Sequence, residues 1–335
     1  MGIIIIAEAG VNHNGSIDTA RELIDAAKSA GADYIKFQTF IPKKLVSEQA
    51  EKAGYQKKRT GSQETQLQML GKLALTFFEF SELKEYCQEK QIGFLSTPFD
   101  LDSIDFLDQL GMDFWKLPSG EITNLPYLEK IAKTKKPIVM STGMCTLEEV
   151  EQALMVFRGG KGYKRRDKIT ILQCNTEYPT PYEDVNLKAM IQMQKRFHCP
   201  VGYSDHTLGL AIPIAAVALG AVVIEKHFTL SREMEGPDHA ASLEPRELEE
   251  MIRSIRQVEL AMGTGEKGPS PSEEKNKVAA RKSIVAARKI TCGEEYTTEN
   301  ITVKRPGGGI SPMRWHELLG QTANQEYEED QPIKE

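Results

Sequence analysis

The sequence predicts an α/β protein: a (β/α)8 TIM barrel followed by a small, mostly β domain. Short β-branched or apolar runs alternate with amphipathic stretches of helical spacing. Eight such strand-and-helix units fit within roughly 260 residues, the count and length of a TIM barrel. A doubly wound open sheet is the alternative, and it would need a glycine-rich phosphate turn after its first strand. The segment there reads AGVNHNG, which does not match that turn.

Each predicted strand is a short apolar run, and each predicted helix has apolar residues at helical spacing. The strands are expected at Ile3–Ala7, Tyr34–Gln38, Gly93–Thr97, Phe114–Leu117, Pro137–Ser141, Ile169–Cys174, Val201–Ser204 and Ala221–His227. The helices are expected at Asp18–Ala30, Phe78–Lys90, Asp102–Leu110, Pro126–Lys133, Leu147–Arg158, Leu187–Arg196, Leu210–Leu219 and Pro245–Met262. The stretch Phe40–Ala74 is an unusually long connection, typical of a lid, an extra helix or an oligomer contact.

The composition changes after Met262, where the predicted catalytic barrel (residues 1–262) ends. Residues 263–281 begin GTGEKGPSPSEEKNK and predict a linker, because so polar a stretch cannot bury a core. Residues 282–335 combine short strands with glycine turns and predict a compact module. A module of about 55 residues is marginal alone, so we expect it to pack on a barrel, its own or a partner's.

Charge and cysteine content narrow the class of protein. The formal net charge of −6 and the pI of about 5.7 argue against a nucleic-acid partner. The five cysteines include no C-x-x-C pair, which fits reduced thiols in the cytoplasm. The first residues, MGIIIIAE, form too short an apolar run for a signal peptide or a membrane span. We therefore expect a cytoplasmic protein that acts away from membranes.

Two histidines, His206 and His227, stand at the ends of the seventh and eighth predicted strands. The carboxyl ends of the strands form the active site of a TIM barrel, so adjacent strands should bring both imidazoles together. A pair of imidazoles with carboxylates nearby favours a divalent-metal site with open positions for water or a carbonyl oxygen. A third histidine, His239, is expected to be an ordinary hydrogen-bonded loop residue.

The other strand ends also carry polar residues, which packing of a barrel interior does not require. The charged residues expected at the mouth are Glu8, Lys36, Lys116, Glu121, Asp205 and Glu225. They are too many for one structural ion pair, because each buried charge costs several kcal/mol unless it is paired. Two lysines with Ser and Thr hydroxyls predict a cradle for phosphate or carboxylate. Glu121 is a candidate acid or base and Tyr178 an orienting hydroxyl, while a lysine Schiff base is the alternative chemistry.

The chain resembles the bacterial sialic acid synthase family in motifs spread over nearly its whole length. They read IIAEAGVNHNGS, DYIKFQTF, FLSTPFD, WKLPSGEITNLPYL, EYPTPYEDVNL, GYSDHTLG, EKHFTL, GPDHAASLEP and VKRPGGGISP. The resemblance implies a TIM barrel joined to a C-terminal antifreeze-like (SAF) domain, in a domain-swapped homodimer. It also implies condensation of phosphoenolpyruvate with an open-chain N-acyl-mannosamine-type sugar, in which phosphate leaves by C–O cleavage.

The matching motifs imply roles for individual residues. His206 and His227 would hold a divalent metal, expected to be Mn²⁺ with Mg²⁺ or Co²⁺ as alternatives. The phosphoenolpyruvate contacts would be Lys36, Thr97, Lys116, Ser119, Thr176 and Ser204. The sugar contacts would be Gln38, Glu121, Tyr178, Asp238 and, from the partner's SAF domain, Arg305. The catalytic residues would be Glu121, Tyr178, His227 and Lys116.

Two departures from the family pattern bear on the substrate. Asn14 stands where the N-acetylneuraminate synthases of bacterial capsules have glutamate, and Thr176 where they have asparagine. GEITNLPYL and GPDHAASLEP are closer to the branch that makes N,N'-diacetyllegionaminate. We therefore expect 2,4-diacetamido-2,4,6-trideoxy-mannose as the sugar, ahead of N-acetylmannosamine. A Schiff-base aldolase and a non-catalytic carbohydrate-binding protein are the remaining alternatives.

Overall fold

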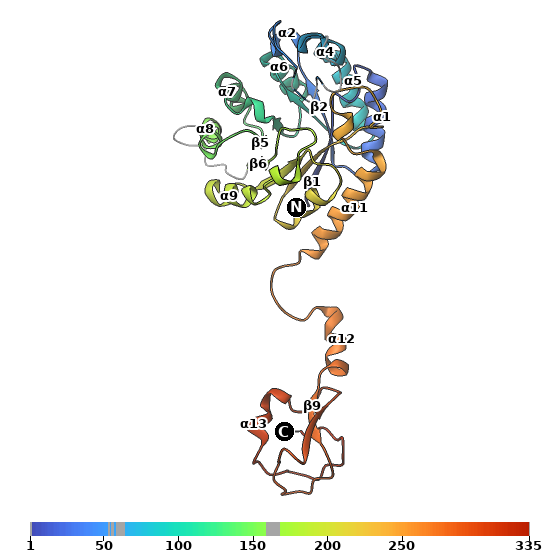
Figure 1. The fold of residues 1–335 in the computed structure, drawn as a ribbon, viewed down its shortest axis with the longest axis vertical. Helices are drawn as coiled ribbons and strands as arrows, with labels where there is room; N and C mark the ends of the chain where they lie inside the picture. Colours follow the sequence, from blue (N-terminus) through green and yellow to red (C-terminus); the bar gives the residue numbers. More distant parts are fainter. Residues whose placement is uncertain (1, 53, 55–56, 58–63, 159–167, 335) are drawn as a thin grey trace. The chain divides into compact units, whose positions relative to one another are not determined.

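The computed structural model describes residues 2–52, 54, 57, 64–158 and 168–334 (Figure 1). The chain divides into two compact units, Met1–Gly263 and Thr264–Glu335, and each has a hydrophobic core of its own. The first unit is an eight-stranded parallel sheet with helices around it, which confirms the predicted TIM barrel. In the described part of the chain, no helix combines the length and apolar character needed to cross a bilayer.

Every predicted strand and helix of the barrel is present, with somewhat different ends. The strands are β1 (Ile4–Gly10), β2 (Tyr34–Thr39), β3 (Gly93–Pro98), β4 (Trp115–Leu117), β5 (Ile138–Ser141), β6 (Ile169–Gln173), β7 (Val201–Asp205) and β8 (Val223–His227). The helices are α1 (Ile17–Ser29), α2 (Pro42–Leu45), α4 (Gln66–Leu73), α5 (Phe77–Glu89), α6 (Leu101–Leu110), α7 (Leu125–Thr134), α8 (Leu147–Arg158), α9 (Lys188–Phe197), α10 (Ala211–Ala218) and α11 (Pro245–Ala261).

The strand order places functional side chains at one level of the barrel. The strands follow the order β3-β2-β1-β8-β7-β6-β5-β4, and β3 and β4 at the two ends of this order also lie next to one another. β1 pairs in parallel with both β2 and β8. Its register sets Glu8 opposite Lys36 on one side and opposite His227 on the other. Residues from three strands therefore meet at the carboxyl end of the sheet.

Short polar sequences fix where the helices begin. Ser16 accepts a hydrogen bond from the Thr19 amide at the start of α1, and Thr76 forms a capping box with Glu79 at the start of α5. These side chains satisfy backbone N–H groups that have no partner within the helix. These caps therefore define where two of the connections that follow barrel strands end and the helices begin.

The long connection Phe40–Ala74 contains α2 and α4, so the expectation of an extra helix is met. Residues 53, 55–56 and 58–63 of this connection lie outside the described residues. The helix α4 begins at a capping box between Thr65 and Gln68. Its buried residues Met69, Leu70 and Leu73 form a small hydrophobic cluster together with Val11 and Phe40. This cluster attaches the connection to the barrel next to β2.

The second unit begins within the predicted linker. That stretch contains α12 (Pro271–Ala280), which buries none of its residues and starts at a Ser270–Glu273 capping box with Pro271 in the first turn. The linker prediction missed this helix because capping, rather than an apolar face, defines it. The module proper pairs β9 (Ser283–Ala286) with β10 (Ile301–Lys304) in antiparallel fashion and includes the short helix α13 (Trp315–Leu318). Its core includes Ile284, Ile290, Tyr296 and Tyr327.

Candidate active site at the carboxyl ends of the barrel strands

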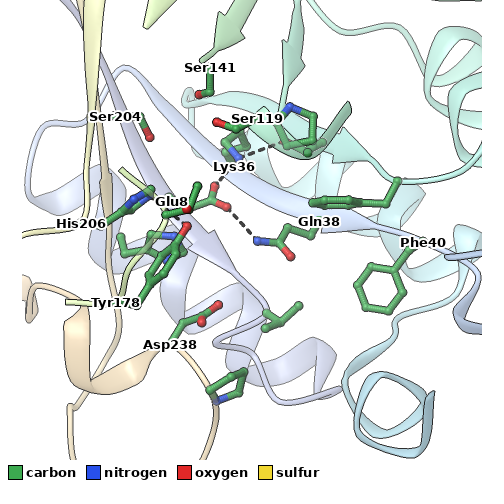
Figure 2. A pocket seen from close by; sticks show the side chains of 18 of the residues that line it. Glu8, Lys36, Gln38, Phe40, Ser119, Ser141, Tyr178, Ser204, His206 and Asp238 are labelled. Carbon is green, nitrogen blue, oxygen red and sulfur yellow. Dashed lines mark hydrogen bonds and ion pairs between the residues drawn. The ribbon is translucent and has the colours of Figure 1, made fainter. Parts of the chain in front are cut away.

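A cavity of about 310 Å³ opens at the carboxyl ends of the barrel strands. Nearly all the predicted site residues line it: Lys36, Gln38, Thr97, Lys116, Ser119, Thr176, Tyr178, Ser204, His206, His227 and Asp238. Figure 2 shows His206, Tyr178 and Asp238 on one side of the pocket and Phe40 on the other, with Gln38 between them. Strand alternation and the parallel register bring together the members that lie on the strands, whereas Ser119, Thr176, Tyr178 and Asp238 come from the segments that follow β4, β6 and β8.

Two buried lysines at the base of the cavity are each held by a carboxylate. Lys36 Nζ lies 2.7 Å from Glu8 Oε2, and Lys116 Nζ lies 3.0 Å from Glu225 Oε1. Lys36 also donates to Thr97 Oγ1 at 3.0 Å. Each of these lysine side chains is less than 5% exposed, so an unpaired ammonium would be very costly there.

The carboxylates extend this network to neighbouring polar groups. Ser204 Oγ donates to Glu225 Oε1 at 2.9 Å, and Gln38 Nε2 donates to Glu8 Oε1 at 3.2 Å. Although burial alone would raise it, Lys116 and Lys36 lower the pKa of Glu225 to about 2. Glu225 is thus an anion at neutral pH. Burial lowers the pKa of Lys116, a shift that Glu225 opposes, whereas, against the effect of burial, Glu225 and Glu8 raise the pKa of Lys36. Both lysines present N–H donors, the groups that bind phosphate and carboxylate.

The two strand-end histidines face each other with their ring centroids 5.4 Å apart. Burial lowers the pKa of His206 to about 4, and burial together with His206 lowers the pKa of His227 well below its usual value. Both imidazoles are therefore neutral at neutral pH, the form that binds metals. His206 Nδ1 contacts the carbonyl oxygen of Asn175, which can only accept, so Nδ1 carries the proton and Nε2 keeps its lone pair.

These residues fit a divalent metal that takes two protein ligands. His206 and Tyr178 both line the cavity, and His206 Nε2 lies 3.1 Å from the Tyr178 hydroxyl. His227 Nδ1 is buried and has no hydrogen-bond partner among the described residues. Within the same residues, no group of three or more His, Cys, Asp or Glu side chains could hold a metal. Water or substrate oxygens would have to supply the other ligands.

Two further carboxyl groups have environments that favour the protonated form. Asp238 lines the cavity, and burial, followed by the charge of Glu8, raises its pKa to about 7. Glu121 is half-buried, and burial raises its pKa although a hydrogen bond from Asn124 opposes the shift. Glu121 accepts that bond at 2.6 Å and follows the cavity residue Gly120, but does not itself line the cavity. Arg305 is exposed in the second unit, and its role stays a prediction.

A tight corner between β4, β5 and β6 sets the position of Ser119. Its hydroxyl accepts from the Gly143 amide at 2.8 Å and lies 3.2 Å from the Cys174 thiol. A Cβ on Gly143 would stand 2.9 Å from Thr176 Cγ2 and 3.0 Å from Ser119 Oγ, so only glycine fits. Cys174 lines the cavity as well, although no motif in the sequence predicts this position. Only the position directly after β6 indicates its location.

The prediction that Asp205 belongs to the mouth was wrong. Its carboxylate lies 2.6 Å from Lys226 Nζ, both side chains are fully buried, and neither lines the cavity. Strand alternation explains the error: Ser204 and His206 lie on one side of the chain and Asp205 on the other. The adjacent strand likewise sends Glu225 and His227 to the cavity and Lys226 away from it. The Asp205–Lys226 pair is a structural ion pair behind the site.

His239 joins a hydrogen-bonded clamp beside Asp238, which agrees with the expectation of a hydrogen-bonded loop histidine. His239 Nε2 lies 3.2 Å from Asn14 Oδ1, and His239 Nδ1 lies 2.7 Å from Thr229 Oγ1. Asn14 Nδ2 donates to the carbonyl oxygen of Glu235 at 2.8 Å. Gly236 has a φ of +154°, and a Cβ there would stand 2.6 Å from His239 Cδ2. Asn14 thus ties the loop after β1 to the turn that carries Asp238.

Comparison with known proteins identifies the family. The NeuB family pattern matches residues 23–267, and the SAF domain pattern matches residues 281–335. The chain is 53% identical over 332 residues to the N,N'-diacetyllegionaminic acid synthase of Campylobacter jejuni, with 99% of each chain covered. It is 46% identical over 320 residues to the synthase of the same name from Legionella pneumophila, with 96% of this chain and 90% of the relative covered.

A solved structure agrees with the sequence relatives. The crystal structure of the N-acetylneuraminic acid (sialic acid) synthetase from Leptospira borgpetersenii superposes with a TM-score of 0.73 at 32% identity, covering 82% of this chain and 90% of that one. The similarity includes the barrel that carries the strand-end lysines and histidines. The predicted resemblance is confirmed, and the chain belongs to the NeuB family and carries a SAF domain at its C-terminal end.

Proposed function

We propose that this protein condenses phosphoenolpyruvate with 2,4-diacetamido-2,4,6-trideoxy-mannose, giving N,N'-diacetyllegionaminate and phosphate. The observation that carries this proposal is one cavity that holds two buried lysines beside two neutral strand-end imidazoles. The names of the relatives at 53% and 46% identity support the sugar. The reaction consumes one water, which provides the new oxygen on the former enol carbon while the phosphate leaves with the original C–O oxygen.

The lysines and hydroxyls bind the anionic substrate in this proposal. Lys36 and Lys116 hold the phosphate and carboxylate of phosphoenolpyruvate, and Ser119, Thr97 and Ser204 donate further hydrogen bonds. Glu8 and Glu225 keep both ammonium groups in place before the substrate arrives. Such fixed charges need little reorganisation when negative charge moves towards the departing phosphate.

The sugar occupies the other side of the cavity. Gln38 and Asp238 hydrogen-bond its hydroxyl and amide groups, and the Tyr178 hydroxyl orients its aldehyde end beside His206. Asp238, with a pKa raised to about 7, can donate as well as accept a hydrogen bond. Glu121, close to the rim, is the proposed group that receives or returns a proton. Thr176, which also lines the cavity, is a further proposed contact of phosphoenolpyruvate.

His206 and His227 are the proposed ligands of a divalent metal, with Mn²⁺ favoured over Mg²⁺ and Co²⁺. When bound, such an ion supplies Lewis-acid polarisation of a carbonyl oxygen. We expect chelation to abolish turnover and added Mn²⁺ to restore it. Full activity after removal of all divalent metal would contradict this assignment and favour a lysine Schiff base.

The assembly and location are also proposals. We infer a domain-swapped homodimer in which Arg305 reaches the partner's cavity, supported by its exposed position in the separate SAF unit. Mixing an Arg305→Ala chain with a chain inactivated at His227 should then restore partial activity, and absence of complementation would argue against the exchange. We infer a cytoplasmic location, since all five cysteines are free.

A substrate panel with phosphate release as the readout tests the proposed function. We expect turnover with the diacetamido-trideoxy sugar to exceed that with N-acetylmannosamine. Higher kcat/KM with N-acetylmannosamine would assign the protein to the N-acetylneuraminate reaction instead. No phosphate release with either sugar would contradict both, and would leave a carbohydrate-binding protein as the explanation.

A further inference from the structure

One side of the active-site cavity is apolar, and this side comes from the long connection after β2. We call it the apolar wall and define it by the cavity-lining residues Phe40, Leu45, Val46, Met69, Leu70 and Leu73. Among the described residues that α2 and α4 contribute to the cavity, Gln66 is the only one with a polar side chain. The opposite side holds the lysines, carboxylates and imidazoles. The cavity is thus divided into a charged end and an apolar end.

The apolar wall is packed in place. Met69, Leu70, Leu73 and Phe40 are buried in one hydrophobic cluster, and Leu45 and Val46 pack against it. Phe40 also contacts Phe99, edge to face, with ring centroids 6.5 Å apart. These contacts resemble those of a small core, so the wall keeps its shape without a ligand.

The wall lies at the end of the cavity away from the reacting groups. Figure 2 places Gln38 between Glu8 and Phe40, and it places Phe40 on the opposite side of the pocket from His206 and Tyr178. A sugar with its aldehyde beside His206 and Tyr178 and its first carbons at Gln38 would extend its remaining carbons towards Phe40 and α4. In that placement the wall would contact the substituents at the far end of the open chain.

The chemistry of that end differs between the two candidate sugars. N-acetylmannosamine carries hydroxyls on its fourth, fifth and sixth carbons. The trideoxy sugar has a methyl group at the sixth carbon and an acetamido group, ending in another methyl, at the fourth. Burial of a hydroxyl without a hydrogen-bond partner is unfavourable, whereas burial of a methyl group is favourable.

We infer that the apolar wall is a specificity determinant. It recognises the methyl group at the sixth carbon of the sugar and the methyl group of its 4-acetamido substituent. This inference rests on the proposed function. The wall binds these methyl groups by burial, and it disfavours a sugar with hydroxyls in their place. Gln66, at the polar edge of α4, lies in the same cavity, where its amide matches the amide of the 4-acetamido group.

Val46 offers a mild substitution for the test. It is half-buried, lines the cavity and has extended backbone angles (φ −131°, ψ 146°) that threonine also favours. Val46→Thr keeps the shape and adds a hydroxyl facing the cavity. Leu45→Gln is a second variant at the neighbouring half-buried position. Val258→Thr on α11 is the matched control, since Val258 is half-buried against the main core and does not line the cavity.

The full-length variants are compared in kcat/KM for both sugars at saturating phosphoenolpyruvate, with thermal unfolding as a check of folding. We expect Val46→Thr and Leu45→Gln to lower the preference for the trideoxy sugar over N-acetylmannosamine about 10-fold, the discrimination that one buried methyl group supports. The KM for phosphoenolpyruvate should not change, and Val258→Thr should behave as the wild type.

The outcomes separate this inference from the proposed function. An equal loss for both sugars, or an unchanged preference, in folded wall variants overturns the inference while the wild-type activity still supports the proposed function. No phosphate release by the wild-type protein with either sugar overturns the proposed function and the inference with it.

Discussion

At the scale of single residues, the cavity depends on two carboxylates that each hold a lysine. Glu8 fixes Lys36 and also accepts from Gln38, so one side chain connects the predicted anion side to the predicted sugar side. Glu225 fixes Lys116 and accepts from Ser204. A buried ion pair with extra hydrogen bonds contributes less to stability than to geometry. The pairs therefore hold both lysine side chains in a fixed orientation towards the cavity.

The substitution Lys116→Met should have separable effects on stability and on binding. It leaves Glu225 as a poorly paired buried charge, so the free energy of unfolding of the barrel should fall by about 3 kcal/mol. The double variant Lys116→Met/Glu225→Gln should recover most of that loss in denaturant titrations. Its kcat/KM for phosphoenolpyruvate should stay about 100-fold below that of the wild type, because a charge-assisted hydrogen bond is missing.

Lys226 supplies the control for this experiment. It is as deeply buried and is also paired with a carboxylate, but it lies behind the site. Lys226→Met should destabilise the barrel by a similar amount and leave the KM for phosphoenolpyruvate unchanged. A comparable rise in KM in both lysine variants would show that the effect of Lys116→Met is structural.

Asp238 should make the stability of the barrel depend on pH. Its folded-state pKa of about 7 exceeds the usual value of 3.8, so the folded protein binds the proton more tightly than the unfolded chain. The stability from this group is fully present below pH about 4 and is lost as pH rises through 7. Between pH 5 and pH 8 the loss amounts to about 2.5 kcal/mol.

Asp238→Asn removes this dependence. We expect the variant to gain stability relative to the wild type between pH 5 and pH 8, measured by denaturant unfolding at both values. Because the wild type and Asp238→Asn share all the other carboxyl groups, including Glu121, the contribution of those groups to the pH dependence cancels in the difference between the two proteins. An equal stability difference at the two pH values would mean that Asp238 titrates normally in the folded protein.

At the scale of elements, the turn after β8 depends on the loop after β1. Asn14 binds both His239 and the carbonyl oxygen of Glu235, on either side of Asp238. Asn14→Ala should loosen this turn and raise the KM for the sugar about 10-fold, with little change in the KM for phosphoenolpyruvate, because Asp238 is a proposed contact of the sugar. Steady-state kinetics with each substrate varied in turn would measure both constants.

Asn14→Asp is the conservative comparison for this clamp. Aspartate keeps the acceptor for His239 and tolerates the left-handed backbone of Asn14 (φ 51°), but it loses the donor to Glu235. It should give a smaller increase in the sugar KM than alanine. Equal increases in both Michaelis constants would indicate a general loss of structure rather than a displaced Asp238.

The elements differ in how far the sequence predicts them. Barrel strands and helices follow from local periodicity and capping, so their number and order could be predicted. The apolar wall could not, because α2 and α4 are short and are held by contacts with Val11 and Phe99, far away in the sequence. The hydrogen-bonded clamp between Asn14 and His239 could not be predicted for the same reason, because these residues are more than two hundred positions apart in the sequence.

The residues of the site follow the same division. His206, His227, Lys36 and Lys116 were predictable because strand ends of a TIM barrel converge. Asp205 was misassigned because neighbouring positions on a strand point in opposite directions, and its partner Lys226 comes from another strand. Which acid holds which lysine depends on side-chain distances that no sequence pattern contains.

At the scale of the whole molecule, the chain consists of a barrel and a small SAF unit, each with its own core. The barrel holds the complete set of lysines and imidazoles, so the chemistry belongs to it. The SAF unit contains Arg305, which is exposed. The helix α12, at the start of the same unit, buries none of its residues. We accordingly propose that the condensation of phosphoenolpyruvate with the sugar takes place in the barrel cavity.

The most direct measurement follows the oxygen that bridges carbon and phosphorus in phosphoenolpyruvate. With ¹⁸O in that position and the trideoxy sugar as co-substrate, our account predicts a nine-carbon keto acid and inorganic phosphate that retains all of the label. Label in the keto acid, or consumption of the sugar without release of phosphate, would contradict the account.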